Sequence, residues 1–377
     1  MNRYLTAVVR SDLTRKMVIL TGPRQVGKTT LARQLMEEHS QAQYLNWDVA
    51  ANRRILVNKS WSPRPDLLVL DEVHKMADWR GYLTEAYDGR AENQLMLAAV
   101  SARMGTSRQT EESLTERYFS ARLHPFSVSE WVTVADAKPE DALDRLIERG
   151  GFPEPFMAEN AELAERWHNR YLADLVREDI AEYARIQEVR SMRRLLELLR
   201  GRTGLPLSIA SLARELQMAP NTISRYLDIL QALYIVFMVR PYSSNIARAI
   251  LKRPKVYFFD TGLVRGDNDA RLENACAAML LKHIHFQQDV LGKASSLHYV
   301  RTKEGSGVDF MLCENGEPSV ILECRHADRK PAPMLFKLAS VFPHAQCIQL
   351  VRELEQEELH RPVSVLKAAQ WLSNLAA

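Results

Sequence analysis

The sequence contains few cysteines and no hydrophobic run that could cross a bilayer. Its four cysteines lack C-x-x-C spacing, which argues against a zinc site or a disulfide framework, so we expect reduced, mostly buried thiols (Cys276, Cys313, Cys324 and Cys347). The longest apolar runs, such as residues 230–239, are about half as long as a membrane-spanning helix requires. Residues 1–16 lack the apolar core of a secretory signal. These absences predict a cytoplasmic protein with no membrane partner.

Charge is nearly balanced over the whole chain but is unevenly distributed along it. The net charge of the 377 residues is +3, whereas residues 190–265 hold 13 Lys or Arg and 4 Asp or Glu, a local net charge of +9. A basic middle in an otherwise mildly acidic protein indicates either a surface for a polyanion or scattered, solvated arginines. The length predicts two or three domains, and the hydrophobic content of 46% is typical of a soluble globular protein.

A glycine-rich motif with the spacing G-x-x-x-x-G-K-T occupies residues 22–29. An apolar run precedes it as a predicted strand, and helical spacing follows it. In such a motif the glycines let backbone N–H groups surround phosphates, and the start of the helix adds positive potential. Lys28 would reach the β- and γ-phosphates, and Thr29 would ligate magnesium. We therefore expect ATP and Mg²⁺ as cofactors, held by the loop residues Gly22, Pro23, Arg24, Gln25, Val26, Gly27, Lys28, Thr29 and Thr30.

A second acidic signal follows the loop. Residues 67–70, with the sequence LLVL, form a predicted buried strand that ends in Asp71-Glu72. This is the Walker B form, in which Asp71 would hold magnesium through water and Glu72 would polarise the attacking water. Residues 44–48 and 94–100 add two more predicted strands, which alternate with helices. The pattern predicts an α/β fold with a parallel sheet and a site at the carboxyl ends of its strands.

Two arginines, Arg103 and Arg117, follow the last of these strands. An arginine of the same or a neighbouring subunit can stabilise the charge of a phosphoryl-transfer transition state, so Arg117 joins Glu72 and Lys28 as a candidate catalytic residue. Both arginines could equally be plain surface residues, because no motif separates the two interpretations.

With these motifs the chain resembles a family of bacterial and archaeal AAA-type ATPases that join a P-loop core to a C-terminal domain of unknown function with a restriction-endonuclease-like ending. The resembling segments follow the family's order along nearly the whole chain: LTGPRQVGKTTL, LLVLDEVHKM, LTERYFSARLHPFSVSEW, GGFPEPF, YLADLVREDI, PNTISRYLDILQALYIV, KVYFFDTGL and VRTKEGSGVDFML. The resemblance implies an AAA-type P-loop NTPase core with a parallel sheet (1–149), a helical linker and winged-helix domain (150–265) and a restriction-endonuclease-like α/β domain (266–377). It also implies ATP hydrolysis or nucleotide switching, and assembly as a homo-oligomer.

Two positions depart from the family's pattern. The family has Thr-Gly-Ser after the later strand, where residues 99–101 of this chain read AVS. Ala99 cannot sense a γ-phosphate as the threonine would, so we expect nucleotide binding to persist and hydrolysis to be slow. The family has Gly-Arg-Tyr where residues 116–118 read ERY, so Arg117 is kept.

The middle of the chain has the pattern of a helix-turn-helix. Residues 208–216 predict a short amphipathic helix, and after a turn Asn221 is expected to cap a second helix, whose apolar face is Ile223, Tyr226, Leu227 and Leu230. This second helix would enter a major groove of DNA with the polar residues Asn221, Thr222, Ser224 and Arg225. Residues 235–239 and 255–259 would form the wing, with basic residues beside it for phosphates (Arg248, Lys252, Arg253 and Lys255). The alternative is a module that binds protein or spaces domains.

The C-terminal part contains a predicted hairpin. Two alternating apolar runs are joined by Asn315-Gly316, a strong hairpin signal, so that Asp309 on one strand would approach Glu323 on the next. A helix predicted at residues 271–282 carries Glu273.

A helix Glu, a strand Asp and a Glu-x-Lys is the pattern of restriction-endonuclease-like nucleases, in which Asp309 and Glu323 would hold a divalent metal as hard oxygen ligands. Arg325 stands where the lysine is expected, and an arginine cannot act as a base. Three interpretations follow: an active nuclease, a remnant that binds nucleic acid or is structural, or a plain core hairpin. For the whole chain the alternatives are an ATPase that handles DNA, an ATP-regulated nuclease, a DNA-binding switch with little hydrolysis, and a nucleotide-switched protein-interaction module.

Overall fold

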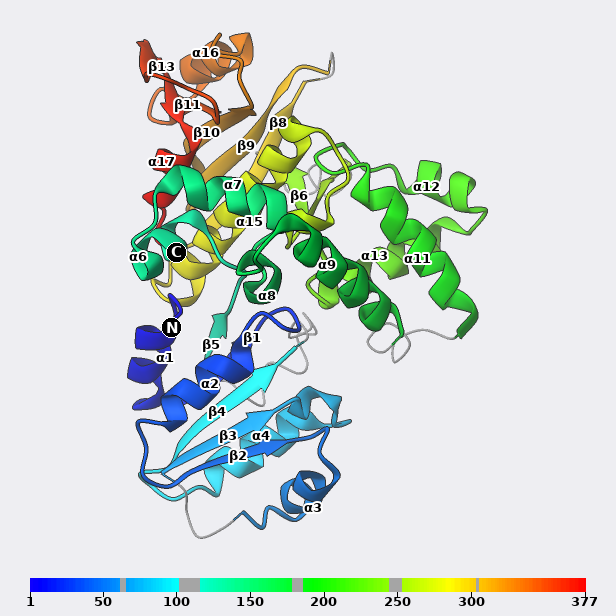
Figure 1. Ribbon diagram of the computed structural model, residues 1–377, viewed down its shortest axis with the longest axis vertical. Coiled ribbons are helices and arrows are strands. Elements are labelled where there is room, and N and C mark those ends of the chain that lie inside the picture. Colours follow the sequence, from blue (N-terminus) through cyan, green and yellow to red (C-terminus); the bar gives the residue numbers. More distant parts are fainter. Residues whose placement is uncertain (62–65, 102–115, 178–185, 244–252, 303–304) are drawn as a thin grey trace. The chain divides into compact units, whose positions relative to one another are not determined.

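The computed structural model describes residues 1–61, 66–101, 116–177, 186–243, 253–302 and 305–377 (Figure 1). Two compact units divide the chain. The first contains Met1–His124 and Ala232–Tyr234, and the second contains Pro125–Gln231 and Ile235–Ala377. Within the described residues, no helix combines the length and the apolar character that a membrane span requires.

The first unit is built on a sheet of five parallel strands in the order β2-β3-β4-β1-β5 (Figure 1). The strands are β1 (Met17–Thr21), β2 (Ala42–Asn46), β3 (Leu67–Asp71), β4 (Leu95–Val100) and β5 (Tyr118–Arg122), and the intervening helices are α2 (Lys28–Met36), α3 (Ala50–Asn58) and α4 (Trp79–Asp88), with α1 (Thr6–Leu13) before the first strand. The predicted α/β fold with a parallel sheet is therefore confirmed. The strand expected at residues 44–48 exists, but it begins and ends two residues earlier.

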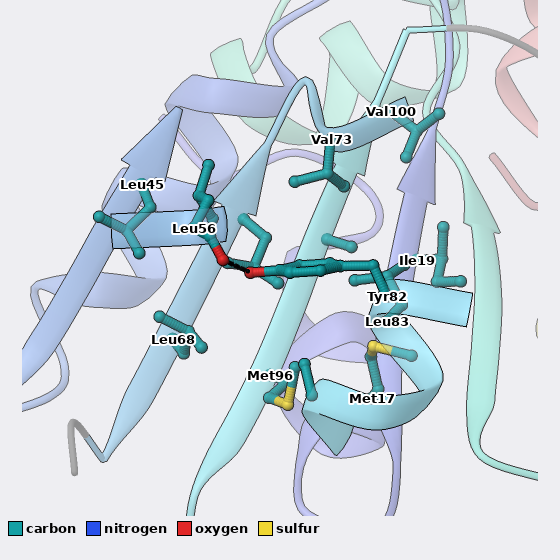
Figure 2. Close-up of a cluster of buried hydrophobic side chains, with 13 residues drawn as sticks. Met17, Ile19, Leu45, Leu56, Leu68, Val73, Tyr82, Leu83, Met96 and Val100 are labelled. Carbon is teal, nitrogen blue, oxygen red and sulfur yellow. Dashed lines mark hydrogen bonds between the residues drawn. The ribbon is translucent and has the colours of Figure 1, made fainter. Parts of the chain in front are cut away.

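Side chains from one face of this sheet form a hydrophobic cluster with α3 and α4. Successive strand residues point to opposite faces of a sheet. Every second residue therefore enters this cluster, namely Met17 and Ile19 of β1 and Leu68 and Leu70 of β3. Figure 2 shows Tyr82 lying across the cluster, where its hydroxyl donates to the Leu56 carbonyl oxygen at 2.9 Å. The apolar burial fixes the sheet and hence the loops at its edge.

The second unit begins with helices and ends with a sheet. Its helices are α6 (Val128–Ala135), α7 (Pro139–Arg149), α8 (Pro153–Phe156), α9 (Ala161–Arg177), α11 (Ile186–Arg200), α12 (Ile209–Leu216) and α13 (Pro220–Ala232). The later helices α15 (Asn268–Asp289), α16 (Pro333–Val341) and α17 (Ala368–Ser373) pack on the sheet, with α15 against β7, β8 and β10. Short 3-10 turns lie at η1 (Val73–Lys75) in the first unit and η2 (Thr261–Leu263) in the second.

The sheet of the second unit has eight strands in the order β12-β13-β11-β10-β9-β8-β6-β7. These are β6 (Val236–Pro241), β7 (Lys255–Phe258), β8 (Ser295–Arg301), β9 (Gly307–Glu314), β10 (Glu317–Arg325), β11 (Gln346–Val351), β12 (Glu358–His360) and β13 (Val363–Lys367). The hairpin predicted from Asn315-Gly316 is confirmed: both residues have positive φ, at 53° and 86°, and β9 pairs antiparallel with β10.

The strands expected to form a wing, β6 and β7, pair antiparallel with each other. Their hairpin does not stand alone, because Arg240 and Pro241 of β6 also pair in parallel with His298 and Tyr299 of β8. The expected domain boundary at 265/266 therefore falls inside one unit whose sheet is built from both sides of it. The other expected boundary, at 149/150, also lies inside the second unit, since the first unit ends at His124.

A buried carboxylate ties together the start of the second unit. Asp260 is 1% exposed and accepts a hydrogen bond from the Gly151 backbone N–H at 2.7 Å, while its other oxygen lies 2.7 Å from His168 Nε2. Gly150 makes room for this arrangement: its φ is +77°, and a Cβ there would lie 2.0 Å from Asp260 Oδ1. The GGFP segment, α9 and the DTGL segment thus meet at one carboxylate.

Gly150→Ala should destabilise the protein severely, because the new methyl group would displace Asp260 from both partners and leave a buried charge poorly paired, at a cost of at least about 3 kcal/mol. Gly292→Ala is the matched control, since Gly292 also has positive φ, at +64°, but nothing within 4 Å of its Cβ position. Backbone strain alone should cost the control about 1–2 kcal/mol. Thermal melting of both variants checks this; equal losses would contradict the role given to Asp260.

Candidate functional site

The glycine-rich loop lies between the carboxyl end of β1 and the start of α2. Its backbone adopts conformations that side chains disfavour: φ is +150° at Gly22 and +102° at Gly27. A Cβ on Gly22 would lie 2.3 Å from the Leu123 carbonyl oxygen, so only glycine fits there. Of the predicted loop residues, Pro23 and Val26 are buried, Arg24 and Thr29 are half-buried, and Gln25 and Thr30 are exposed. The loop therefore has the strand-to-helix setting that its spacing predicts.

The ammonium group of Lys28 folds back over this loop. Lys28 is 5% exposed, and its Nζ donates to the carbonyl oxygens of Gly22 at 3.0 Å and Pro23 at 2.7 Å. Both of these partners are uncharged, so a phosphate that enters the loop would offer the ammonium group a stronger, charge-assisted hydrogen bond.

Arg3, from the N-terminal segment, forms hydrogen bonds with the backbone of the loop and of His124. The guanidinium of Arg3 donates to the carbonyl oxygens of Val26 at 2.7 Å and His124 at 2.6 Å, and Arg3 is 7% exposed. Sequence reasoning missed Arg3, since nothing in the order of residues connects position 3 with a motif that begins at Gly22. Both hydrogen bonds go to carbonyl oxygens, so Arg3 holds the backbone of the loop and of the neighbouring His124 in place.

Thr29 and Asp71 meet at the carboxyl edge of the sheet, as the motifs predict. The Thr29 hydroxyl donates to Asp71 Oδ2 at 2.8 Å, and the Tyr44 hydroxyl donates to the same oxygen at 2.5 Å. Burial, and then the hydrogen bond to Asp71, raises the pKa of Tyr44 to about 12, so its hydroxyl keeps its proton. Tyr44 is a second residue that sequence reasoning missed, because the strand pattern at residues 42–46 carries no sign of its partner.

The oxygens of Thr29 and Asp71 fit a magnesium ion. Magnesium prefers hard oxygen ligands and usually keeps several waters, so that one hydroxyl, one carboxylate and the phosphates of a nucleotide suffice. Among the described residues, no three His, Cys, Asp or Glu side chains form a group that could hold a metal ion.

Glu72 directly follows Asp71 and is fixed by its own partners. The Ser101 hydroxyl donates to Glu72 Oε1 at 2.6 Å, and the side chains of His74 and Lys75 lie 3.9 and 3.4 Å from Oε2. Burial on its own would raise the pKa of Glu72, but the Ser101 hydrogen bond and the nearby cations outweigh it and leave the pKa below its usual value. Glu72 is therefore a carboxylate at neutral pH, which a group that polarises water must be.

The residues that depart from the expected pattern lie beside Glu72. Ala99 is fully buried, and its carbonyl oxygen accepts the Glu72 backbone N–H at 3.1 Å. Its methyl group offers no hydrogen bond to a phosphate, whereas Ser101 supplies one to Glu72.

Arg117 lies at the wrong end of the sheet to act on a nucleotide in its own subunit. It immediately precedes β5, and Tyr118 pairs with Met17 at the start of β1, whereas the loop follows Thr21 at the end of β1. Its guanidinium is paired with the exposed Asp88, with Nε 2.8 Å from Oδ1. The prediction that Arg117 acts from within the same subunit is therefore wrong, and a role toward a neighbouring subunit stays a prediction. Arg103 lies outside the described residues.

The helix pair of the second unit has the predicted apolar face, since Ile223, Tyr226, Leu227 and Leu230 are all buried. Asn221 and Arg225 are exposed and Thr222 and Ser224 half-buried on the other side of α13. The expected cap is wrong: α13 begins at Pro220, so Asn221 lies inside its first turn, because proline at the first helical position needs no N–H partner. The winged-helix assignment itself stays a prediction.

A groove of about 470 Å³ runs between these helices and the β6–β7 hairpin. Ser224 and Gln231 of α13 line one side, and Arg240 and Arg253 line the other, both of them exposed. Lys255, expected beside them as a phosphate contact, is 8% exposed and paired with carboxylates, so that expectation is wrong. Arg248 and Lys252 lie outside the described residues.

The eight-stranded sheet of the second unit, called the terminal sheet below, and helix α15 bring together the acidic residues named in the sequence analysis. Glu273 comes from α15, Asp309 from β9 and Glu323 from β10, and the Asp309 backbone N–H donates to Glu323 Oε2 at 3.1 Å. Lys255 of β7 joins them, with Nζ 2.9 Å from Glu273 Oε1 and 3.1 Å from Asp309 Oδ1. Arg325 pairs with Glu323 Oε1. Below, these five residues are called the carboxylate cluster.

Burial and repulsion between the carboxylates change the pKa values in this cluster. Burial and the neighbouring Asp309 raise the pKa of Glu273 to about 7 and that of Glu323 to about 8. Burial opposes the charge on Lys255, but Glu273 and Asp309 outweigh it and raise the Lys255 pKa above its usual value. Three carboxylates against two cations favour one shared proton, which makes the cluster neutral overall.

Comparisons with known proteins match the first unit to a domain family. Residues 14–132 match the family model of an AAA domain, and residues 140–268 match that of a domain of unknown function (DUF8612). An uncharacterised protein of Mycobacterium tuberculosis is 29% identical over 309 residues, which cover 80% of this chain and 68% of that protein. An uncharacterised protein of Haemophilus influenzae is 23% identical over a region that covers 74% of this chain and 78% of that protein. A Walker-type ATPase of Pyrococcus abyssi is similar in structure with a TM-score of 0.39 and 14% identity, over 68% of this chain and 93% of that one.

The AAA-domain match, the parallel sheet and the loop geometry define the first unit as an AAA-type P-loop domain. Such a domain binds nucleotide, usually together with magnesium.

Lys28→Ala should weaken ATP binding at least about 100-fold, because the loop loses the cation that would hold two phosphates, and each charged hydrogen bond contributes about 1.5–3 kcal/mol. Titration with a fluorescent ATP analogue measures the change. Lys16→Ala is the control, since Lys16 precedes the opposite end of β1 and its Nζ lies over the ring of Phe119. Tight ATP binding retained by Lys28→Ala would refute the assignment of the site.

Proposed function

We propose that the protein is a magnesium-dependent ATPase or nucleotide switch whose nucleotide state controls contact with a nucleic acid. One observation carries the first half of this proposal. The ammonium of Lys28, the hydroxyl of Thr29 and the carboxylates of Asp71 and Glu72 all lie at the carboxyl edge of one parallel sheet, next to the phosphate loop. These are the groups that phosphoryl transfer needs, in the order along the chain that the P-loop chemistry predicts.

In this proposal each residue has a separate task. The loop from Gly22 to Thr30 and Lys28 bind the phosphates of ATP. Thr29 and Asp71 would hold the magnesium ion, which neutralises charge on the phosphates when bound. Glu72, oriented by Ser101, accepts a proton from the attacking water. Since Ala99 gives the γ-phosphate no hydrogen bond, turnover is slow, and an arginine such as Arg117 of a neighbouring subunit would speed it only in a homo-oligomer.

Glu72→Gln should leave ATP affinity within about threefold of the wild type and lower turnover at least about 100-fold, because the amide cannot accept the proton of the water. Release of phosphate under single-turnover conditions and a binding titration measure the two effects. Ser101→Ala should lower turnover less, since Glu72 then keeps its carboxylate and loses only its orientation. Unchanged turnover in Glu72→Gln would remove Glu72 from the mechanism.

The nucleic-acid half of the proposal depends on charge and on helix α13. Residues 190–265 carry the local net charge of +9, and the exposed side of α13 presents Asn221 and Arg225 while Arg240 and Arg253 line the neighbouring groove. A polar helix face beside arginines fits a DNA groove and its phosphates. We propose three functional parts: an ATPase core (1–149), a helical and winged-helix part (150–265) and a terminal part (266–377). The last two parts share one sheet.

Replacing both Arg225 and Arg253 with alanine should weaken duplex DNA binding and reduce the slope of log affinity against log salt by about 2, about 1 for each lost phosphate contact. Fluorescence anisotropy at several salt concentrations gives both quantities. Arg170→Ala is the control, because the Arg170 side chain on α9 is 84% exposed and lies outside the basic region. Binding without steep salt dependence would instead favour a nucleotide-switched protein-interaction module.

A further inference from the structure

The carboxylate cluster holds three acidic side chains that would repel one another if no cation were present. Glu273, Asp309 and Glu323 reach the same place from one helix and two strands. In a low-dielectric interior, carboxylates this close either take up protons or bind a cation. A restriction-endonuclease-like site would supply that cation as a divalent metal.

The protein's own side chains already occupy the oxygens that a metal would need. Lys255 Nζ bridges Glu273 Oε1 and Asp309 Oδ1, at 2.9 and 3.1 Å. The second oxygen of Asp309 accepts the Cys324 backbone N–H at 3.1 Å. The two oxygens of Glu323 are taken by Arg325 and by the Asp309 backbone N–H. Backbone N–H groups as well as side chains donate to these carboxylates, so the fold itself positions the donors.

The space around Glu273 is filled as well. The Tyr257 hydroxyl donates to Glu273 Oε1 at 2.5 Å, on the oxygen that Lys255 also contacts. The backbone of Gly204 packs against the same carboxylate so closely that a Cβ there would lie 2.8 Å from both of its oxygens. A hydrated metal ion bound to Glu273 would therefore have to displace protein atoms.

From these contacts we propose that Lys255 is a resident cation that takes the place of the metal ion in the carboxylate cluster. The lysine head group is a compact charge on a long stem, which suits it to a position between two carboxylates better than a planar guanidinium. With Lys255 in this position, the carboxylate cluster does not fit a divalent ion, so it does not cut nucleic acid by a metal-dependent route. This inference is independent of the nucleotide site of the first unit.

A positive consequence distinguishes this proposal from a plain core hairpin. If Lys255 stands in for a metal, then removing its charge leaves three carboxylates facing one arginine, and a divalent ion should enter. Lys255→Met keeps an unbranched stem of similar shape and removes the ammonium group. The variant should gain a metal site that the wild-type chain does not have.

The experiment measures Mn²⁺ binding by electron paramagnetic resonance of the free ion. It uses the full chain without nucleotide in an Asp71→Asn background, which removes the metal carboxylate of the first unit. Lys255→Met should bind one Mn²⁺ at least tenfold more tightly than the background protein, and adding Asp309→Asn should abolish the gain. A Lys255→Met protein that folds and binds no more Mn²⁺ than the background overturns the proposal.

Lys282→Met is the matched control. Lys282 is also buried, at 1% exposed, and its Nζ pairs with the carboxylate of Glu130 in the same unit. It should lose stability as a buried ion pair does when one partner is removed, and it should gain no Mn²⁺ site. Equal gains in both variants would show nonspecific binding to a disrupted protein and overturn the proposal.

The background protein gives a second test that does not depend on the folding of Lys255→Met. With Lys255 in place, Asp309→Asn should leave Mn²⁺ binding unchanged, because no ion occupies the carboxylate cluster. If the background protein binds Mn²⁺ and loses it in Asp309→Asn, the carboxylate cluster is a working metal site, and Lys255 is not its resident cation.

Discussion

The pairing of buried lysine ammonium groups with fixed oxygens is the constraint on which both units depend. An unpaired charge in the interior costs several kcal/mol, so each buried lysine needs partners that the fold supplies. Lys255 and Lys282 face carboxylates and are held there by opposite charge. Lys28 donates to two neutral carbonyl oxygens of its own loop, and its charge also helps to lower the pKa of the nearby Glu72. Because Lys28 lies at the phosphate loop, a phosphate that enters the loop can offer its ammonium group a charge-assisted hydrogen bond.

The same constraint links sheet topology to chemistry. Parallel strands end at one edge, so Thr29 meets Asp71 and Ser101 meets Glu72 although these pairs lie far apart in sequence. In the second unit, a lysine on β7 and acids on α15 and β9 meet because β6 and β7 join the terminal sheet at one edge and α15 packs on that sheet. The strands that looked like a separate wing thus deliver the cation that balances the terminal acids.

Local patterns predicted what depends on local geometry. The loop's glycine spacing, the buried strands, the apolar face of α13 and the Asn315-Gly316 turn all follow from short-range rules. Contacts between distant segments could not be predicted: Arg3 behind the loop, Tyr44 on Asp71, and Lys255 among the acids. A basic residue beside a strand has the same appearance in sequence whether it points to solvent or into a cluster. Arg117 shows the same limit, since only the strand register places it at the far edge.

We propose that the first unit binds a nucleotide through Lys28, together with a magnesium ion that Thr29 and Asp71 would hold. Isothermal titration calorimetry of the wild-type protein with ATP, performed with magnesium and again with a chelator, tests it most directly. We expect one site per chain, with affinity at least about tenfold higher when magnesium is present, because the ion would bridge the phosphates to the protein. Absence of binding, or binding that is indifferent to magnesium, would contradict it.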